Sequence, residues 1–314
     1  MKVFLCETIH PEAYRLLAEH AEILPSWEMC GEADALINRA LMIGPAEMDR
    51  MPNLRVIAVH GTGTDGVDLA EAKRRGIKTV YAPHLNANAV AELNVSLLLA
   101  AARKVVLSDR IIRREDERSV TEKMAEAQLL LRGTELRGKT AGLLGFGAIG
   151  QRTAEILQKG FGMNCIAWMP RLTPERTERY GVQCAPSPEE LLKVSDAVIL
   201  AMPLTEENRG FMNRERLGRM KPGSILVNAS RGGLVDEEAL LESLKNGPLG
   251  AAACDVMMKD FPERDNPLLA LPNFTATPHI GANTDDALYA VGMACVKQIF
   301  DVMEGREPEY PAAQ

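Results

Sequence analysis

The sequence predicts an α/β protein with two domains, each built around a doubly wound parallel sheet. Three observations predict this class. Short apolar strands alternate with amphipathic helices along most of the 314 residues. A G-x-G-x-x-G motif at 145–150 stands between such a strand and such a helix. A separate series of strands and helices precedes this motif, and a chain of this length has room for two domains of about 150 residues each.

The first series of elements covers residues 1–95. Strands are expected at 2–6, 35–38, 55–59 and 78–80, and helices at 12–20 and 69–75. Pro11 opens the first of these helices, and Gly76 ends the second. A glycine-rich loop, 60–66, directly follows the third strand. This alternation indicates a parallel sheet.

The middle of the chain is expected to be helical. Residues 87–117 are interpreted as one long helical stretch, because apolar side chains recur at helical spacing from Leu93 to Ile112. The charged run 113–118 is interpreted as a solvated face of that stretch. The segment 119–137 has weak periodicity, and no structure is assigned to it.

The second series of elements begins at Thr140. Strands are expected at 140–144, 163–168, 196–201, 224–228, 249–254 and 274–277, and helices at 151–159, 188–194 and 236–245. A last helix at 285–304 is expected to return the chain to the first unit.

The glycine motif has the context of a dinucleotide-binding turn. Gly145 permits a tight turn, Gly147 lets the backbone approach a pyrophosphate, and Gly150 lets the helix lie close to the strand. The N–H groups that open this helix carry the positive end of its dipole and can hold phosphate. The alternative is a glycine-rich turn that binds nothing, and the strand–turn–helix context argues against it.

These elements predict a discontinuous arrangement of two domains. An outer domain would consist of 1–95 and 286–314, and a dinucleotide-binding Rossmann domain, 96–285, would be inserted into it. The crossings near 95 and 285 would then be hinges beside a cleft.

Composition excludes several classes of function. The net charge is −7 and the sequence has no block of Lys and Arg, which argues against nucleic acid or an anionic membrane as a partner. No apolar run is long enough to span a bilayer, and residues 1–7 are interpreted as a strand instead of a signal sequence. The six cysteines form no C-x-x-C pair, so we expect reduced thiols in the cytoplasm and no metal site.

Polar side chains follow three strands of the second unit. Arg231 comes after 224–228, Asp255 and Asp260 come after 249–254, and His279 comes after 274–277. Ligands of open parallel sheets bind outside the carboxyl ends of the strands. An arginine fork suits a carboxylate, and a histidine can transfer a proton near neutral pH. Taken singly, Arg231 could be part of a helix start and His279 an ordinary loop residue, but their joint placement favours a site.

Several stretches in this order resemble one known family. They are 60–68, 86–92, 133–140, 145–150, 203–205, 228–237 and 278–282, and they run over nearly the full length. The chain resembles the D-isomer-specific 2-hydroxyacid dehydrogenases, which include phosphoglycerate, glycerate, hydroxypyruvate and formate dehydrogenases.

The resemblance implies an oxidoreductase that transfers a hydride between nicotinamide C4 and C2 of a small 2-oxo acid. Arg231 would anchor the substrate carboxylate, and His279 would be the acid/base. The backbone of Gly61, Thr62 and Gly63 would bind the substrate from the other side. Besides the motif glycines, the implied cofactor neighbours are Ala148, Ile149, Pro203, Ala229, Ser230, Asp255, Gly281, Ala282 and, more weakly, Val90.

The resemblance also implies a flavodoxin-like outer domain and a homodimer. The long helix and the segment 113–137 would form the dimer contact through the dinucleotide-binding domains. Because the chain ends soon after the last helix, we expect no appended regulatory domain of the kind that some phosphoglycerate dehydrogenases carry.

One departure from the family concerns the partner of the histidine. The family usually places a glutamate twenty-nine residues after the arginine, and here Asp260 stands at that position, within Lys259-Asp260-Phe261-Pro262. Aspartate is one methylene shorter, so it reaches His279 only if the backbone comes closer, or through a water molecule. We expect Asp260 to partner His279; the alternative is a surface acid in a loop.

A second departure concerns the cofactor. NAD-binding domains of this kind carry an acid about twenty residues past the glycines, on the ribose 2′-OH. Here that place holds Trp168-Met169-Pro170-Arg171. Met169 does not repel a 2′-phosphate and Arg171 could pair with one, so we favour NADP over NAD. The alternative is that Arg171 and Arg176 are simply solvated.

Two rival functions stay open. A nucleotide-sensing binding module, like the corepressors that share this fold, would bind the cofactor without turnover, but the presence of both Arg231 and His279 argues against it. Formate oxidation would lead us to expect other polar residues around the histidine. The sequence does not specify which 2-oxo acid is the substrate.

Overall fold

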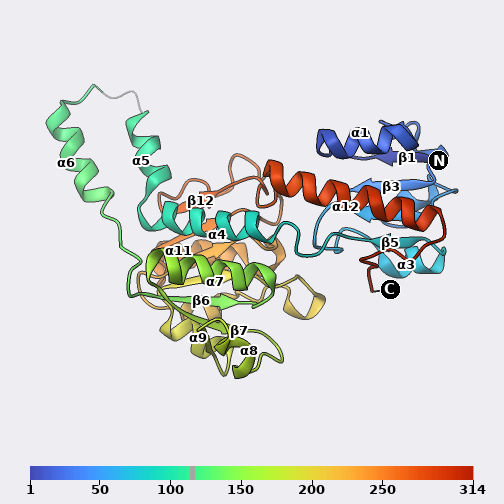
Figure 1. The fold of residues 1–314 in the computed structure, drawn as a ribbon. Coiled ribbons are helices and arrows are strands. Elements are labelled where there is room, and N and C mark those ends of the chain that lie inside the picture. The colour runs from blue at the N-terminus through green and yellow to red at the C-terminus, as the bar shows by residue number, and fades with distance from the viewer. Residues whose placement is uncertain (114–116, 314) are drawn as a thin grey trace. The chain divides into compact units, whose positions relative to one another are not determined.

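The computed structural model describes residues 1–113 and 117–313, and these fall into two compact units (Figure 1). Unit 1 consists of Met1–Ala89 and Ala282–Gln314, and unit 2 consists of Val90–Gly281. The chain therefore crosses between the units at 89–90 and at 281–282.

Unit 1 is built on a five-stranded parallel sheet in the order β2-β1-β3-β4-β5. Its strands are β1 (Lys2–Leu5), β2 (Glu22–Leu24), β3 (Ala35–Asn38), β4 (Val56–Val59) and β5 (Lys78–Val80). This order is the flavodoxin-like one that the resemblance implied. The edge strand β2 was not predicted, since it has three residues and buries only Leu24 fully.

Helices cover both faces of the unit 1 sheet. They are α1 (Pro11–His20), α2 (Pro45–Asp49), α3 (Leu69–Arg74) and α12 (Asp285–Met303), with a 3-10 turn, η1 (Cys30–Glu32). Side chains that alternate along a strand face opposite ways, so Ala35 and Ile37 pack against α1 and α12, whereas Leu36 packs with Met48 of α2. In Figure 1, α12 (red) lies beside α1 (blue), which confirms that the last helix returns to the first unit.

Unit 2 is built on a seven-stranded parallel sheet in the order β12-β11-β10-β9-β6-β7-β8. Its strands are β6 (Thr140–Leu144), β7 (Asn164–Trp168), β8 (Gln183–Cys184), β9 (Ala197–Leu200), β10 (Ile225–Asn228), β11 (Ala251–Cys254) and β12 (Phe274–Ala276). Counted from β6, this is the doubly wound dinucleotide-binding order with one further strand at the β12 edge. The predicted α/β class with two parallel sheets is confirmed.

Two apolar cores lie on the two faces of the unit 2 sheet. Its helices are α4 (Ala87–Ala102, which begins in unit 1), α5 (Val105–Ile112), α6 (Val120–Leu130), α7 (Ala148–Phe161), α8 (Pro174–Glu178), α9 (Pro188–Val194), α10 (Arg214–Gly218) and α11 (Glu237–Asn246). Short 3-10 turns, η2 (Glu206–Asn208) and η3 (Gly232–Leu234), complete the unit.

The prediction of one helix over 87–117 is wrong. Helix α4 ends at Ala102, Lys104 takes a left-handed conformation with φ of 53°, and α5 begins at Val105. The returning chain packs at this break, because Thr134 N–H donates to the Ala102 carbonyl oxygen at 2.9 Å. Helix α5 buries no side chain fully, and Ile112 is 82% exposed. Residues 114–116 of the predicted stretch lie outside the described residues.

Helix α6 occupies part of the segment to which no structure was assigned. Ser119 and Glu122 form a capping box at its start, so an N-terminal signal was present in the sequence. The helix buries no side chain fully, and the apolar periodicity that marks a packed helix is therefore weak.

Within the described residues, no helix is long and apolar enough to cross a membrane. All six cysteines are free. Burial raises the pKa of the Cys165, Cys254 and Cys295 thiols to about 12, so these three stay protonated and unreactive.

Candidate active site

The three glycines of the turn between β6 and α7 have two different roles. Two of them are required for packing, and the third leaves space for a ligand. Gly145 has a φ of 108°, and a Cβ there would lie 2.2 Å from the Ala201 carbonyl oxygen. A Cβ at Gly150 would lie 2.4 Å from the Gly145 carbonyl oxygen. In contrast, a Cβ at Gly147 would meet nothing within 4 Å. Gly145 and Gly150 are therefore required by the fold, while the open space at Gly147 suits a ligand.

Helix α7 presents free N–H groups beside that open space. Its first hydrogen bond runs from Gln151 N–H to the Gly147 carbonyl oxygen at 2.9 Å. The N–H groups of Ala148 and Ile149 come before that bond, so they have no acceptor within the helix. The fourteen-residue α7 adds the positive end of its dipole, and the turn can therefore hold a pyrophosphate.

Two arginines follow the end of β7. Arg171 is exposed and has a left-handed φ of 60°, while Met169 before it is half-buried. Arg176, in the first turn of α8, donates to the Phe146 carbonyl oxygen at 3.4 Å. Phe146 belongs to the glycine turn, so Arg176 lies against that turn and is not simply solvated.

The turn that carries Arg231 is braced by Asn228, the last residue of β10. The side chain of Asn228 is fully buried; it accepts from Ser230 N–H and donates to the Arg231 carbonyl oxygen, both at 3.0 Å. Ser230 Oγ in turn donates to the Met202 carbonyl oxygen at 2.5 Å. Arg231 Nη1 donates to the Ser230 carbonyl oxygen at 2.8 Å. The guanidinium is therefore borne on a rigid turn.

Asp255 holds the segment that carries His279. Its buried carboxylate accepts from Thr277 Oγ1 at 2.6 Å and from the N–H groups of Ile280 and Gly281 at 2.8 Å. The His279 N–H also donates to the Asp255 carbonyl oxygen at 2.8 Å. These contacts sustain a left-handed φ of 54° at His279, which costs a non-glycine residue about 1 to 2 kcal/mol. The cofactor contact that the resemblance implies for Asp255 is a separate role and stays a proposal.

The structure brings Asp260 and His279 together. Asp260 Oδ2 lies 2.8 Å from His279 Nδ1, and both side chains are 40% exposed. A proton on Nδ1 would be donated to the carboxylate and would leave Nε2 as the free nitrogen. The shorter side chain therefore reaches the histidine directly, without the water molecule considered above.

The remaining predicted positions of unit 2 lie close to these segments or in the loops beside them. A Cβ at Gly281 would lie 3.1 Å from Asp255 Oδ2 and 3.5 Å from Val90 Cγ2, so Val90 adjoins this loop. The carbonyl oxygen of Pro203 accepts from the Asn208 side chain at 2.8 Å, which shapes the loop after β9. Ala229 is half-buried against one of the two cores.

The glycine-rich loop of unit 1 offers two backbone donors. Gly61 N–H already donates to the Val59 carbonyl oxygen at 2.8 Å. Thr62 Oγ1 donates to Asn86 Oδ1 at 2.7 Å, which fixes the loop. The N–H groups of Thr62 and Gly63 have no acceptor in the part of the chain that the structure describes. Ala282, also predicted as a cofactor neighbour, is the first residue of the returning segment of unit 1.

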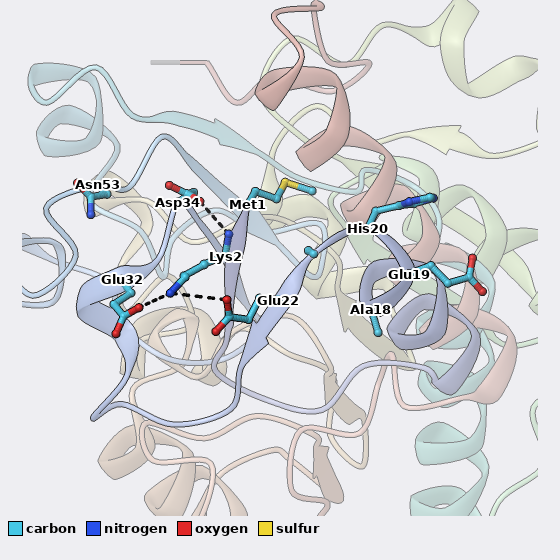
Figure 2. A pocket seen from close by; sticks show the side chains of 10 residues that line it. Met1, Lys2, Ala18, Glu19, His20, Glu22, Glu32, Asp34 and Asn53 are labelled. Carbon is cyan, nitrogen blue, oxygen red and sulfur yellow. Dashed lines mark hydrogen bonds and ion pairs between the residues drawn. The ribbon is translucent and has the colours of Figure 1, made fainter.

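A pocket of about 710 Å³ lies elsewhere in unit 1, at the N-terminus (Figure 2). Lys2 engages three of its acidic side chains: Lys2 Nζ pairs with Glu22 and Glu32, and Lys2 N–H donates to Asp34 at 2.8 Å. None of the predicted site residues lines this pocket, so its size does not indicate the site of the chemistry.

Comparison with known proteins gives the family. The model of the D-isomer specific 2-hydroxyacid dehydrogenase NAD-binding domain matches residues 95–281, more than half of the chain. The chain belongs to this family. The resemblance inferred from the sequence is confirmed.

Relatives of this 2-hydroxyacid dehydrogenase family member match over nearly all of the chain. It is 38% identical to the hydroxypyruvate reductase of Thermotoga maritima, over 93% of the chain and 92% of that protein. It is 36% identical to the D-3-phosphoglycerate dehydrogenase of Methanocaldococcus jannaschii, over 98% of the chain but only 59% of that longer protein. The crystal structure of the TT0316 protein from Thermus thermophilus is 35% identical, covers 100% of both chains and has a TM-score of 0.84.

Sequence reasoning missed three residues of the site. Asn228, Glu237 and Thr277 bond to the segments that carry Arg231, Asp260 and His279, as shown for Asn228 and Thr277 above. A signal existed for the first two, because both lie in the 228–237 stretch that carries the resemblance. Their partners are set by tertiary contacts, and the sequence alone does not show them.

Proposed function

We propose that this protein is an NAD(P)-dependent D-2-hydroxyacid dehydrogenase that interconverts a small 2-oxo acid and its 2-hydroxy acid. One observation carries the proposal. Arg231, Asp260 and His279 follow β10, β11 and β12, which are neighbouring parallel strands, and the glycine turn follows β6 of the same sheet. The carboxyl ends of parallel strands share one edge, where such sheets bind their ligands.

In the proposed reaction, the side chains bind the substrate and supply the proton. Arg231 holds the substrate carboxylate, and His279 Nε2 protonates the carbonyl oxygen as the alcohol forms. Asp260 keeps His279 oriented through Nδ1. The N–H groups of Thr62 and Gly63 are proposed as further donors to the substrate. The bound dinucleotide supplies or accepts the hydride.

Each unit would have its own part in this function. Unit 2 would bind the dinucleotide, since it carries the glycine turn and the family match covers 95–281. Unit 1 would contribute the substrate loop at 61–63. This division follows the domain prediction made from the sequence.

The proposed cofactor is NADP in preference to NAD. Met169 stands where an acid would otherwise accept from the ribose 2′-OH, and Arg171 beside it is exposed. Arg176 adds a second cation, against the glycine turn. Two guanidinium groups at the end of β7 favour a dinucleotide with a 2′-phosphate.

The direct test is a kinetic screen of the purified protein. Glyoxylate, hydroxypyruvate, pyruvate, phenylpyruvate and bulkier or sulfonated 2-oxo acids would each be assayed with NADPH and NADH. We expect turnover with at least one acid, a lower KM for NADPH, and a loss of kcat of about 100-fold or more in His279→Ala.

Two outcomes would contradict these proposals. An NADH preference above tenfold would refute the cofactor assignment alone. Binding of NADPH without turnover of any acid would favour the alternative, a nucleotide-sensing module; the Asp260–His279 pair argues against that alternative, because a sensor needs no proton donor.

We also propose a homodimer that forms through α5 and α6. These helices stand apart from the sheet of unit 2 (Figure 1) and expose several large apolar side chains. The exposed fractions are 55% for Val105, 82% for Ile112, 76% for Val120, 56% for Met124 and 77% for Leu129. Apolar side chains gathered on a pair of projecting helices fit a second copy of the chain.

A further inference from the structure

Asp260 lies in a segment that has no regular structure of its own. Residues 255–273 contain no helix or strand, and the neighbouring Met258 and Phe261 side chains are 59% and 81% exposed. The Asp260–His279 pair is itself 40% exposed on both sides. An ion pair this open to water is too weak to hold a loop in place. Another contact must therefore keep Asp260 where it is.

The backbone of this segment packs against the Arg231 turn. A Cβ at Gly232 would lie 2.0 Å from the Met257 carbonyl oxygen, so only glycine allows the two backbones to lie this close. Met257 itself is buried. This close approach restricts the path of the 255–273 backbone beside the Arg231 turn, but it is a packing contact and not a hydrogen bond.

The bond comes from Glu237. Its Oε1 accepts from the Met258 N–H at 2.7 Å, the length of a charge-assisted hydrogen bond. Glu237 is half-buried and is the first residue of α11, where the helix dipole stabilises a carboxylate. A second side-chain bond beside Asp260, between Lys259 and Glu263, joins two exposed groups of the same segment and does not tie that segment to another element.

We propose that Glu237 is a positioning residue that keeps Asp260 within hydrogen-bonding distance of His279. The inference rests on the proposed function, in which His279 is the acid/base. Met258 and Asp260 are two positions apart, so their Cα atoms are at most ~7 Å from each other and the anchor acts locally. Because aspartate has a short side chain, a small retreat of this backbone breaks its contact with the imidazole. The Glu237–Met258 hydrogen bond thus allows the short side chain of an aspartate at position 260 to contact His279.

Three variants test the proposal: Glu237→Ala, Glu237→Gln and, as a matched control, Glu238→Ala. Glu238 is the exposed next residue of α11. Glutamine keeps an oxygen that accepts from Met258 N–H but removes the charge, so it separates the bond from the electrostatic effect. Nitrogen-15 NMR of the histidine side chains reports which ring nitrogen of His279 carries the proton. The pH–rate profile reports how turnover depends on the protonation of His279.

We expect both Glu237→Ala and Asp260→Asn to shift His279 away from the Nδ1–H tautomer, and Glu237→Ala to lower kcat about tenfold with the KM for NADPH unchanged. Glu237→Gln should restore both readouts in large part, and Glu238→Ala should match the wild type. The double variant Glu237→Ala/Asp260→Asn should be no slower than Asp260→Asn alone, because both changes break one contact.

The proposal is overturned if Glu237→Ala leaves the His279 tautomer as in the wild type. It is equally overturned if Glu237→Gln is as impaired as Glu237→Ala, since the bond would then not be the cause. The tautomer is measured without turnover. If the wild type reduces no 2-oxo acid, the proposed function fails while the NMR comparison still decides the role of Glu237.

Discussion

His60 shows what burial does to a single side chain. It directly follows β4 and begins the glycine-rich loop, yet only 6% of it is exposed and its Nε2 has no partner in the described structure. Burial, helped by the positive charge of Arg39, lowers the pKa of His60 from 6.5 to about 4. The side chain therefore stays neutral at physiological pH and is part of the core of unit 1.

A pH dependence of stability follows from His60. The unfolded chain takes up the proton near pH 6.5, while the folded chain resists it until about pH 4. The contribution of His60 to the free energy of unfolding is therefore constant above pH 6.5. It falls by about 3 kcal/mol as the pH drops from 6.5 to about 4. Urea unfolding at pH 7, 5 and 4 should show a flatter acid dependence in His60→Leu than in the wild type.

The control for this prediction is His84→Asn. His84 is exposed, and asparagine tolerates its left-handed φ of 69°. Its acid dependence should match that of the wild type. Equal slopes for His60→Leu and the wild type would show that His60 does not cause the loss.

For Asp260 and His279, the sequence predicted the two residues but not the details of their contact. The order of the strands and the choice of residue types identified both side chains from the sequence. Whether the shorter acid reaches the imidazole depended on the path of an irregular segment, which Gly232 and Glu237 set from another part of the chain. No local pattern encodes such a contact.

Among the elements, the glycine turn was the easiest to predict. The sequence motif predicted a different role for each of its three glycines, and their surroundings in the structure differ in the same way. Gly145 and Gly150 face protein backbone, whereas Gly147 faces open space.

Two substitutions test this separation. Gly147→Ala should cost no more than about 1 kcal/mol of stability, since its φ of −78° is allowed, but should weaken NADPH binding because the methyl group fills the open space. Gly145→Ala should cost at least about 2 kcal/mol, since it combines a left-handed φ with a backbone clash. Urea unfolding and NADPH titration measure the two effects. Unchanged NADPH affinity in Gly147→Ala would argue against the turn as the phosphate site.

Helices α4, α5 and α6 were the hardest elements to predict. The break between α4 and α5 has neither proline nor glycine, and Lys104 supplies the left-handed residue. The cause is tertiary, since Thr134 docks on the last turn of α4 and Lys104 Nζ donates to the Leu130 carbonyl oxygen at 2.7 Å. Apolar positions such as Ile112 then face water and do not pack on the core.

At the scale of the whole molecule, these exposed positions predict a dimer. The wild type should sediment as a dimer, because burial of several large apolar side chains on α5 and α6 stabilises association. Met124→Asp and Leu129→Asp should shift the protein to a monomer. Met42→Asp is the control, since Met42 is 70% exposed but lies in unit 1. A monomeric wild type, or a Met42 variant with the same effect, would contradict the assignment of the contact.

The sequence by itself determined the α/β class, nearly every strand and the glycine turn, because these depend on periodicity and spacing along short stretches. It also indicated the family, through the resemblance of several stretches to those of known members. It placed the crossings between the units only approximately, near 95 and 285, where the structure has 89–90 and 281–282.

Only the tertiary structure decided which groups meet: Asp255 with the 277–281 segment, Glu237 with Met258, and Arg176 with the glycine turn. These contacts join residues about twenty or more positions apart. Their geometry depends on how whole elements pack, and packing is not visible in any local pattern of residues.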